Sequence, residues 1–150
     1  GGHRSAAGVT IARSQVEAFA ERFNAVARAA LSADDLVPEL RVDLELPFDA
    51  ATDQLESLLR HLEPCGAGNP SPVLVARGVT LGAPPRAVGK DGLKLVLQRG
   101  GHTLDAIGWG MADRKGELDV GRPFDVAFRL DRDEWRGEAR LQARLSDFRS

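Results

Sequence analysis

The stretch LKLVLQR, residues 93–99, alternates apolar and polar side chains. Leu93, Leu95 and Leu97 would lie on one face of a strand and the residues between them on the other, because successive side chains of an extended chain point to opposite faces. The same period recurs in PVLVARGVTL (72–81), TLDAIGWGM (103–111), FDVAFRL (124–130) and EARLQARLSDF (138–148). Five strands this close together predict a small closed barrel, since closure removes exposed sheet edges.

The connections favour hairpins but do not fix the strand order. GKDG, residues 89–92, has the turn chemistry of a hairpin, and the charged links at 110–123 and 131–137 are typical of exposed loops. A five-stranded antiparallel OB-fold is the commonest barrel of this size. An SH3-like barrel or a sandwich stays open, because periodicity does not reveal topology.

Two helical segments precede the barrel. A short strand, GVTIA (8–12), leads into SQVEAFAERFNAVARAAL (14–31), where Ser14 and Glu17 have the spacing of a capping box. The apolar positions of this segment recur at helical spacing and predict a buried stripe: Val16, Phe19, Ala20, Phe23, Ala27, Ala30 and Leu31. SADD (32–35) and Pro38 would end this helix.

A second strand and helix follow. RVDLELPF (41–48) predicts a strand with Val42, Leu44 and Leu46 on one face. DAATDQLESLLRHLEP (49–64) predicts a helix that is capped by Asp49, ended by Pro64, and apolar on the side of Leu55, Leu58, Leu59 and Leu62. PCGAGNPSP (64–72) is rich in turn formers and predicts an ordered connector.

Composition narrows the class of protein. The chain has 150 residues, of which 43% are hydrophobic and 28% charged, as in a soluble globular protein of one or two domains. No apolar run is long enough to span a membrane, and no segment resembles a signal peptide. A single cysteine, Cys65, excludes an internal disulfide and fits a reducing compartment, so we expect a cytoplasmic protein without a membrane partner. The three histidines lie too far apart for zinc spacing.

The charge is unevenly distributed. Residues 1–63 carry 6 Lys/Arg and 11 Asp/Glu, whereas residues 64–150 carry 14 and 11. The barrel is therefore the better place for a polyanion such as single-stranded nucleic acid, which needs cations for phosphates and aromatic rings for bases. Trp109 and Trp135 are the candidate rings, and the candidate cations are Arg77, Lys90, Lys94, Arg99, Arg129, Arg132, Arg136, Arg140 and Arg144. The residues do not form a complete catalytic motif.

The chain opens GGHRSAAG, residues 1–8. Adjacent glycines let a backbone approach a ligand, and His3, Arg4 and Ser5 could donate hydrogen bonds to an anion such as phosphate. The same opening is also typical of a cloning remnant or a frayed terminus, so the residues alone leave both interpretations open.

Longer motifs resemble a known family. GGHRSAAG resembles the GGH-x-x-A-A-G signature of the DHHA1 domain, the substrate-binding half of DHH-family phosphoesterases. RVDLEL (41–46), LLRHLEPCGAGNPSPV (58–73), KLVL (94–97), DAIGWGM (105–111) and DEWRGEARLQARLSDFR (133–149) resemble the C-terminal region of the RecJ family of single-strand-specific 5′→3′ DNA exonucleases. Cys65 and Trp109 depart from the family, which usually has an aromatic residue and a smaller aromatic residue there.

The resemblance implies an α+β chain of two parts. Residues 1–39 would be the C-terminal part of a DHHA1 α/β domain, cut within that domain, and 40–150 an OB-fold domain with a leading strand and helix (40–63) and a barrel at about 72–150. A substrate phosphate would bind at Gly1, Gly2, His3, Arg4 and Ser5. Single-stranded DNA would bind at Lys90, Lys94, Trp109, Arg129, Trp135, Arg136, Arg140 and Arg144.

The resemblance also implies a role in DNA recombination and repair. In the family, a separate DHH domain carries the Asp/His cluster that binds Mn²⁺ or Mg²⁺ and activates water for phosphodiester hydrolysis. That cluster is absent from this sequence, so we expect the chain to bind single-stranded DNA with a 5′ end, to contain no catalytic or metal-binding residue, and to be inactive alone. The isolated helix at 14–31 would then expose Phe19 and Phe23.

Two other functions remain open. The barrel could be a non-catalytic module that recruits a protein partner such as a single-strand-binding protein. A DHH-type phosphatase acting on small nucleotides is the other, although such relatives would not need a block of five strands.

Overall fold

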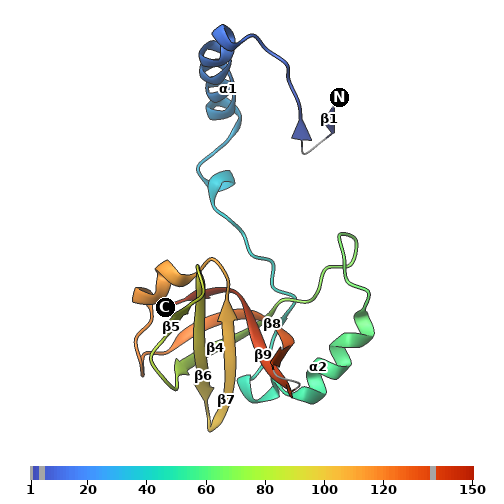
Figure 1. Cartoon of the computed structure of the whole chain (residues 1–150), viewed down its shortest axis with the longest axis vertical. Helices are drawn as coiled ribbons and strands as arrows, with labels where there is room; N and C mark the ends of the chain where they lie inside the picture. Colours follow the sequence, from blue (N-terminus) through green and yellow to red (C-terminus); the bar gives the residue numbers. More distant parts are fainter. Residues whose placement is uncertain (1, 4–5, 136–137) are drawn as a thin grey trace. The chain divides into compact units, whose positions relative to one another are not determined.

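The computed structural model describes residues 2–3, 6–135 and 138–150. The chain divides into two compact units, residues 1–39 and 40–150 (Figure 1). Each unit is described by itself.

The first unit is a small hairpin followed by a helix. β1 (Gly2–His3) pairs antiparallel with β2 (Ala6–Ala7), and α1 (Val16–Ala30) lies between the 3₁₀ turns η1 (Arg13–Gln15) and η2 (Asp34–Leu36). The predicted strand at 8–12 is wrong, because residues 8–12 contain no strand. The predicted capping box is also wrong: η1 incorporates Ser14, and no side chain caps α1.

The apolar stripe of α1 lies on the surface. Phe19 and Phe23 are 43% and 63% exposed, and their ring centroids are 5.9 Å apart. The prediction of a buried stripe therefore fails, and the expectation that these two rings are exposed is confirmed. The unit has an amphipathic helix but buries none of its described residues.

The second unit is built on one sheet. Within the described residues it has seven strands, which are β3 (Leu44–Glu45), β4 (Leu74–Leu81), β5 (Arg86–Val88), β6 (Gly92–Arg99), β7 (His102–Gly108), β8 (Phe124–Trp135) and β9 (Glu138–Arg149). Their order is β3-β4-β8-β9-β7-β6-β5, and β4 also pairs with β6. This extra pairing closes a ring of β4, β6, β7, β9 and β8 (Figure 1).

The prediction of five antiparallel strands is wrong in number and in direction. β3 runs parallel to β4, and β7 runs parallel to β9. β5 was missed because a three-residue strand is too short to show a period. The closed ring nevertheless agrees with the predicted barrel and excludes an open sandwich.

The predicted inward face of β6 is confirmed, and β8 also buries alternate side chains. Leu93, Leu95 and Leu97 are at most 1% exposed, and Val126 and Phe128 of β8 are fully buried. Inward side chains from all five ring strands form one apolar core. Because these side chains point inward, their sequence neighbours form the outer surface of the barrel.

A short helical segment packs against this core. It consists of η3 (Phe48–Ala50), α2 (Asp53–Leu59) and η4 (Arg60–Leu62). The cap is Thr52, whose hydroxyl accepts a bond from the Leu55 backbone N–H at 3.3 Å, and the prediction of Asp49 is wrong. Leu55 and Leu59 pack against the core, but Leu58 and Leu62 are about half exposed, so only part of the predicted apolar side is used.

Of the two segments that flank α2, the leading strand before it differs from its prediction and the connector after it does not. Leu46 is buried, but Val42 and Leu44 are exposed, so the predicted apolar face of the leading strand is wrong at two of three positions. The connector is ordered as predicted. Asn69 Nδ2 donates to the Leu62 and Pro64 carbonyls at 2.7 and 3.2 Å, which fixes the GNP turn after the helix.

β8 and β9 continue as a two-stranded ribbon. Residues Asp131–Trp135 pair with Glu138–Gln142, so the loop predicted at 131–137 is wrong for 131–135. The charged residues there led to the error, because charge indicates exposure to solvent and does not define the backbone conformation. The other strand boundaries also moved: β7 ends at Gly108, before Trp109, and η5 (Ala112–Glu117) follows.

Candidate nucleic-acid interface

An open groove of about 930 Å³ lies on the outer surface of the barrel. It is bounded by β5, β6, β7 and the β8–β9 ribbon, and it is lined by Val88, Lys94, Asp105, Ile107, Trp109, Asp131, Arg132, Asp133, Arg140, Leu141, Gln142 and Arg144. We call this the barrel groove. Its lining combines cations, carboxylates, a tryptophan and a few aliphatic side chains.

Strand register places the cations in a row. Arg86 lies opposite Lys94, Lys94 opposite Ile107, and Ile107 beside Arg144, which in turn faces Arg129. A second row two residues further along contains Val96, Asp105, Gln142 and Asp131. The outer surface of the sheet therefore has a cationic row next to a row that carries carboxylates.

The groove lining includes four of the predicted cations, which are Lys94, Arg132, Arg140 and Arg144. Lys94 Nζ lies 3.7 Å from Asp105 Oδ2, and both side chains are partly exposed. Arg144 is exposed and has no hydrogen bond or ion pair among the described residues. Arg140 lies opposite Asp133 in the ribbon. Lys94, Arg140 and Arg144 thus place three positive charges in the lining of the groove, where phosphates could approach.

Arg129 and Arg132 are held by the fold. Arg129 donates from Nε to the Ser71 carbonyl at 3.2 Å and from Nη1 to Ser146 Oγ at 2.8 Å. Arg132 donates to Glu56 Oε2 at 2.9 Å and Asp53 Oδ1 at 2.8 Å, and the hydrogen bond to Glu56 is the main cause that raises the pKa of Arg132. Their charges are therefore committed to neighbouring parts of the unit.

Four predicted cations among the described residues lie outside the groove lining: Arg77, Arg99, Lys90 and Arg129. Arg77 pairs with Glu45 at 2.8 Å and Asp125 at 3.0 Å, and Arg99 donates to the Arg77 carbonyl. Lys90 is exposed in the turn between β5 and β6. Arg77 and Arg99 thus form a structural cluster beside β3, whereas Lys90 is free to approach a ligand that extends past the β5–β6 turn.

The Trp109 ring lines the groove, is exposed, and packs on the β5–β6 hairpin. The side chain is 57% exposed. A Cβ on Gly92 would lie only 3.0 Å from Trp109 Cζ3 and 2.8 Å from the Val88 carbonyl, so the ring rests directly on the β5–β6 hairpin. The Met111 backbone N–H donates to the Asp91 carbonyl at 3.0 Å and ties the segment after Trp109 to the same hairpin. An exposed ring held in this way suits stacking on a base.

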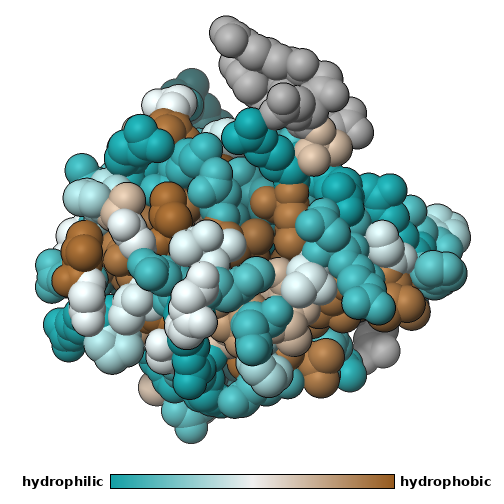
Figure 2. Space-filling view, turned by 90° about the horizontal axis from the view of Figure 1, so that it is seen from below, coloured by the Kyte–Doolittle hydropathy of each residue, from teal (hydrophilic) through white to brown (hydrophobic). Residues whose placement is uncertain are grey.

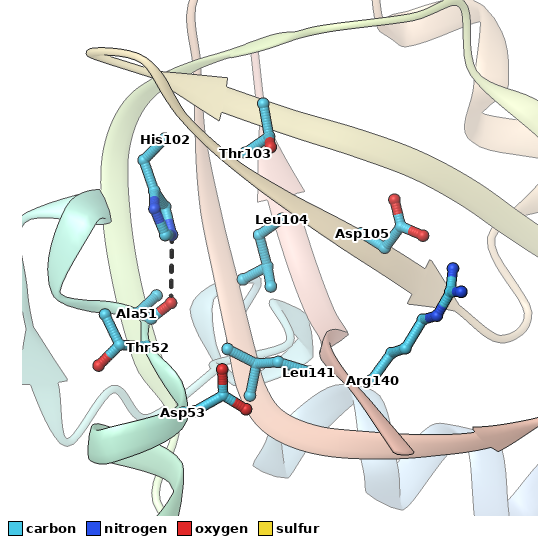
Figure 3. Close-up of a pocket in the computed structure, with 9 residues that line it drawn as sticks. All are labelled: Ala51, Thr52, Asp53, His102, Thr103, Leu104, Asp105, Arg140 and Leu141. Carbon is cyan, nitrogen blue, oxygen red and sulfur yellow. Dashed lines mark hydrogen bonds between the residues drawn. The ribbon is translucent and has the colours of Figure 1, made fainter. Parts of the chain in front are cut away.

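A smaller pocket of about 360 Å³ continues from the groove (Figure 3). The two share Asp105, Arg140 and Leu141 as lining residues. His102 lies on the far side of the pocket, with Nε2 3.2 Å from the Ala51 carbonyl (Figure 3). Together they form one path along β7 and β9, from Trp109 to the residues before α2.

The match to known families covers this same unit. The family model described as the RecJ OB domain matches residues 42–147. The chain belongs to the RecJ OB-domain family. The resemblance to the C-terminal region of the RecJ family is thereby confirmed for the OB domain, and the closed ring of five strands is the OB barrel of that domain.

Individual RecJ proteins match beyond the OB domain. The single-stranded-DNA-specific exonuclease RecJ of Bacillus subtilis (strain 168) is 26% identical over 148 residues, which cover 98% of this chain and 19% of that protein. Crystal structures of RecJ from Thermus thermophilus in complex with Mn²⁺ and with Mg²⁺ superpose with TM-scores of 0.75 and 0.69, at 28% and 25% identity. They cover 100% and 94% of this chain and 21% of each Thermus chain. The chain thus spans about a fifth of the length of these relatives.

Several predicted site residues lie outside the description of the structure. Gly1, Arg4, Ser5 and Arg136 are outside the described residues, and so are the side chains of His3 and Trp135. Gly2 lies in β1, opposite Ala7. The predicted phosphate-binding loop and the tip of the β8–β9 ribbon of the RecJ OB domain therefore stay predictions.

Sequence reasoning missed part of the groove lining in the RecJ OB domain. Asp105, Asp131 and Gln142 occupy outward positions, so strand alternation could have identified the first and the last. Asp131 was assigned to a loop, and Val88, which also lines the groove, belongs to the short strand β5. The alternation of inward and outward side chains could identify lining residues in the long strands, but not those in strands that were too short or were assigned to loops.

The RecJ OB domain has no evident metal centre in its described part. Among residues 2–3, 6–135 and 138–150 there is no group of three or more His, Cys, Asp or Glu side chains arranged to hold a metal ion. In the same residues no helix is both long and apolar enough to cross a membrane.

Proposed function

We propose that this chain is the single-strand-binding, C-terminal part of a RecJ-type 5′→3′ exonuclease that acts in DNA recombination and repair. The observation that carries the proposal is the barrel groove, in which Lys94, Arg144 and Trp109 line one continuous opening. Oligonucleotides commonly bind OB-folds across this kind of face, between the second and third barrel strands and the flanking loops. Here these strands are β6 and β7.

The groove combines the two contacts that a single strand requires. Phosphates would meet Lys94, Arg140 and Arg144, with Lys90 beyond the β5–β6 turn, and a base would stack on Trp109. Stacking contributes about 1–3 kcal/mol per base and tolerates any sequence. Figure 2 shows one face of the molecule, on which hydrophilic side chains predominate and hydrophobic side chains form small groups. Trp135 and Arg136 would extend the path along the ribbon.

The first unit would contribute the other end of the path. We infer that residues 1–39 are the C-terminal part of a DHHA1 domain and that Gly1–Ser5 bind a phosphate of the strand with its 5′ end. Support comes from the Bacillus subtilis relative, which aligns over 98% of this chain and therefore beyond the OB domain.

Hydrolysis would take place outside this chain. The two Thermus thermophilus RecJ structures are described in complex with Mn²⁺ and Mg²⁺, and such an ion activates water for phosphodiester cleavage. The described residues offer no cluster that fits such an ion, so this chain would hold the strand while other parts of a cytoplasmic parent enzyme cut it. Alone, it would bind DNA without degrading it.

Fluorescence-anisotropy titration tests the proposal. The chain would be titrated with 5′-phosphorylated single-stranded DNA, duplex DNA and RNA at several salt concentrations. We expect a preference for single-stranded DNA and a slope of log K against log[salt] of about −2, for three phosphate contacts. Arg144→Ala and Trp109→Ala should weaken binding, whereas Arg122→Ala, an exposed arginine outside the groove lining, should not.

The alternative, a module that recruits a protein such as a single-strand-binding protein, makes the opposite prediction. Equal and negligible binding to all three nucleic acids, with no effect of Arg144→Ala, would reject the DNA path and favour a protein partner. Strong binding to duplex and single strand alike would reject the single-strand preference.

A further inference from the structure

Asp105 occupies a critical position in the barrel groove. It lies on β7, between the cationic row and the ribbon, and it lines both the groove and the pocket that continues from it. Its Oδ2 is 3.7 Å from Lys94 Nζ. Figure 3 shows the Asp105 carboxylate on the same side of the pocket as the Arg140 guanidinium. A strand following the path would have to pass this carboxylate.

We propose that Asp105 competes with DNA phosphates for Lys94 and so keeps the grip of the groove weak and rapidly reversible. The inference rests on the proposed function and assigns a regulatory role within the same site. A nuclease that shortens a strand has to let the remaining strand move, and a groove lined only by cations would hold it in place. When a phosphate leaves Lys94, the Asp105 carboxylate takes its place as the partner of the lysine.

The geometry suits competition. The Lys94 and Asp105 side chains are 33% and 49% exposed, and an ion pair this exposed is weak enough for an incoming phosphate to displace the carboxylate. The displaced carboxylate stays in the groove wall and repels the bound phosphate. Asp131 and Asp133 line the same groove from β8 and add to this repulsion. Two effects therefore weaken DNA binding: the Lys94–Asp105 ion pair has to break, and the carboxylates of the groove repel the bound phosphate.

The test is Asp105→Asn, which keeps the shape of the side chain and removes its charge. With 5′-phosphorylated single-stranded DNA at low salt, we expect roughly three- to tenfold tighter binding, the size of one unscreened interaction between charges about 5 Å apart in water. Most of the gain should appear as slower dissociation in stopped-flow anisotropy. It should shrink as salt screens the groove.

Two further variants separate this mechanism from general charge effects. Asp119→Asn makes the same change in net charge at an exposed loop position outside the groove lining, and its affinity should stay within about twofold of wild type. In a Lys94→Ala background, Asp105→Asn should produce a clearly smaller gain, since the residue it competes for is gone.

The outcomes are distinct. If Asp105→Asn binds and dissociates like the unmodified chain, or if Asp119→Asn gives the same gain, the proposed competition is wrong. An undiminished gain in the Lys94→Ala background would show that Asp105 acts on the DNA directly and would overturn its link to Lys94. If the unmodified chain shows neither single-strand preference nor salt dependence, the proposed function fails, and this inference fails with it.

Discussion

Replacing Glu56 with glutamine tests how α2 is held on the barrel. Glu56 is a buried carboxylate whose side chain is 6% exposed. Its Oε1 accepts from Arg60 Nε at 2.5 Å, and its Oε2 accepts from Arg132 Nε at 2.9 Å. Arg132 also reaches Asp53, so the network joins α2 to the β8–β9 ribbon beside the groove.

The loss of stability in Glu56→Gln depends on whether Arg60 and Arg132 keep a partner or contact with water. Removing one partner of a buried ion pair costs about 3–5 kcal/mol when the other charge is left buried and unpaired. Here Arg60 is 55% exposed and Arg132 keeps Asp53, and glutamine retains an oxygen that can accept one of the two bonds. We therefore expect Glu56→Gln to lower the free energy of unfolding by about 1–3 kcal/mol.

The loss should depend on pH in a defined direction. Burial raises the pKa of Glu56, but the hydrogen bonds from Arg60 and Arg132 and the attraction of their positive charges together lower it by more, so the folded pKa lies below the ordinary value of 4.5. A carboxyl with a depressed pKa stabilises the fold fully above its unfolded pKa and loses that contribution as the pH falls through its folded pKa. The difference between wild type and variant should be constant near neutral pH and shrink in acid.

Urea denaturation followed by far-UV circular dichroism, at neutral and acid pH, measures this difference. Glu63→Gln is the matched control, because Glu63 is an exposed glutamate that follows η4 and has no side-chain partner among the described residues. Equal midpoints for Glu56→Gln and wild type at neutral pH, or a difference unchanged in acid, would refute the argument that paired charges hold α2.

Three more substitutions test the groove and its support. Gly92→Ala places a Cβ 3.0 Å from the Trp109 ring and 2.8 Å from the Val88 carbonyl, so we expect about a threefold or greater loss of single-strand affinity in anisotropy titrations and altered tryptophan fluorescence. Asn69→Ala removes two hydrogen bonds to backbone carbonyls and should lower stability by about 1 kcal/mol in urea, with DNA affinity unchanged. Arg129→Ala should cost about 1 kcal/mol of stability and reduce affinity less than Arg144→Ala does, since Arg129 is bonded to Ser71 and Ser146.

The long barrel strands could be predicted from the sequence because a buried face imposes a strict two-residue period. Leu93, Leu95 and Leu97 alternate with exposed or half-exposed residues and were placed correctly. β5 and the outer part of β8 were not predicted. β5 is too short to show a period, and the outer part of β8 carries charges because it extends into solvent as a ribbon.

The sequence could predict which side chains of the candidate site lie on the outer surface of the barrel, but not their contacts. Alternation shows that Lys94, Arg129 and Arg144 point outward, but it does not show what each one meets. The Ser71 carbonyl that accepts from Arg129 is 58 positions away, and Glu56, which accepts from Arg132, is 76 positions away. Such long-range contacts depend on tertiary packing and leave no trace in local sequence.

This pairing changes the interpretation of the net charge. Residues 64–150 have an excess of cations in the sequence, yet Arg77, Arg114, Arg129 and Arg132 all donate to acceptors within the fold. Apart from Arg132, which is bonded to Glu56 and Asp53, the groove is lined by three cations (Lys94, Arg140 and Arg144) and three carboxylates (Asp105, Asp131 and Asp133), so it has no net positive charge. A surface with so little excess charge cannot hold a polyanion by attraction alone. Binding then depends on the positions of Lys94, Arg140 and Arg144 relative to Trp109. We therefore expect the arrangement of these side chains, more than the total charge, to determine the affinity for a single strand.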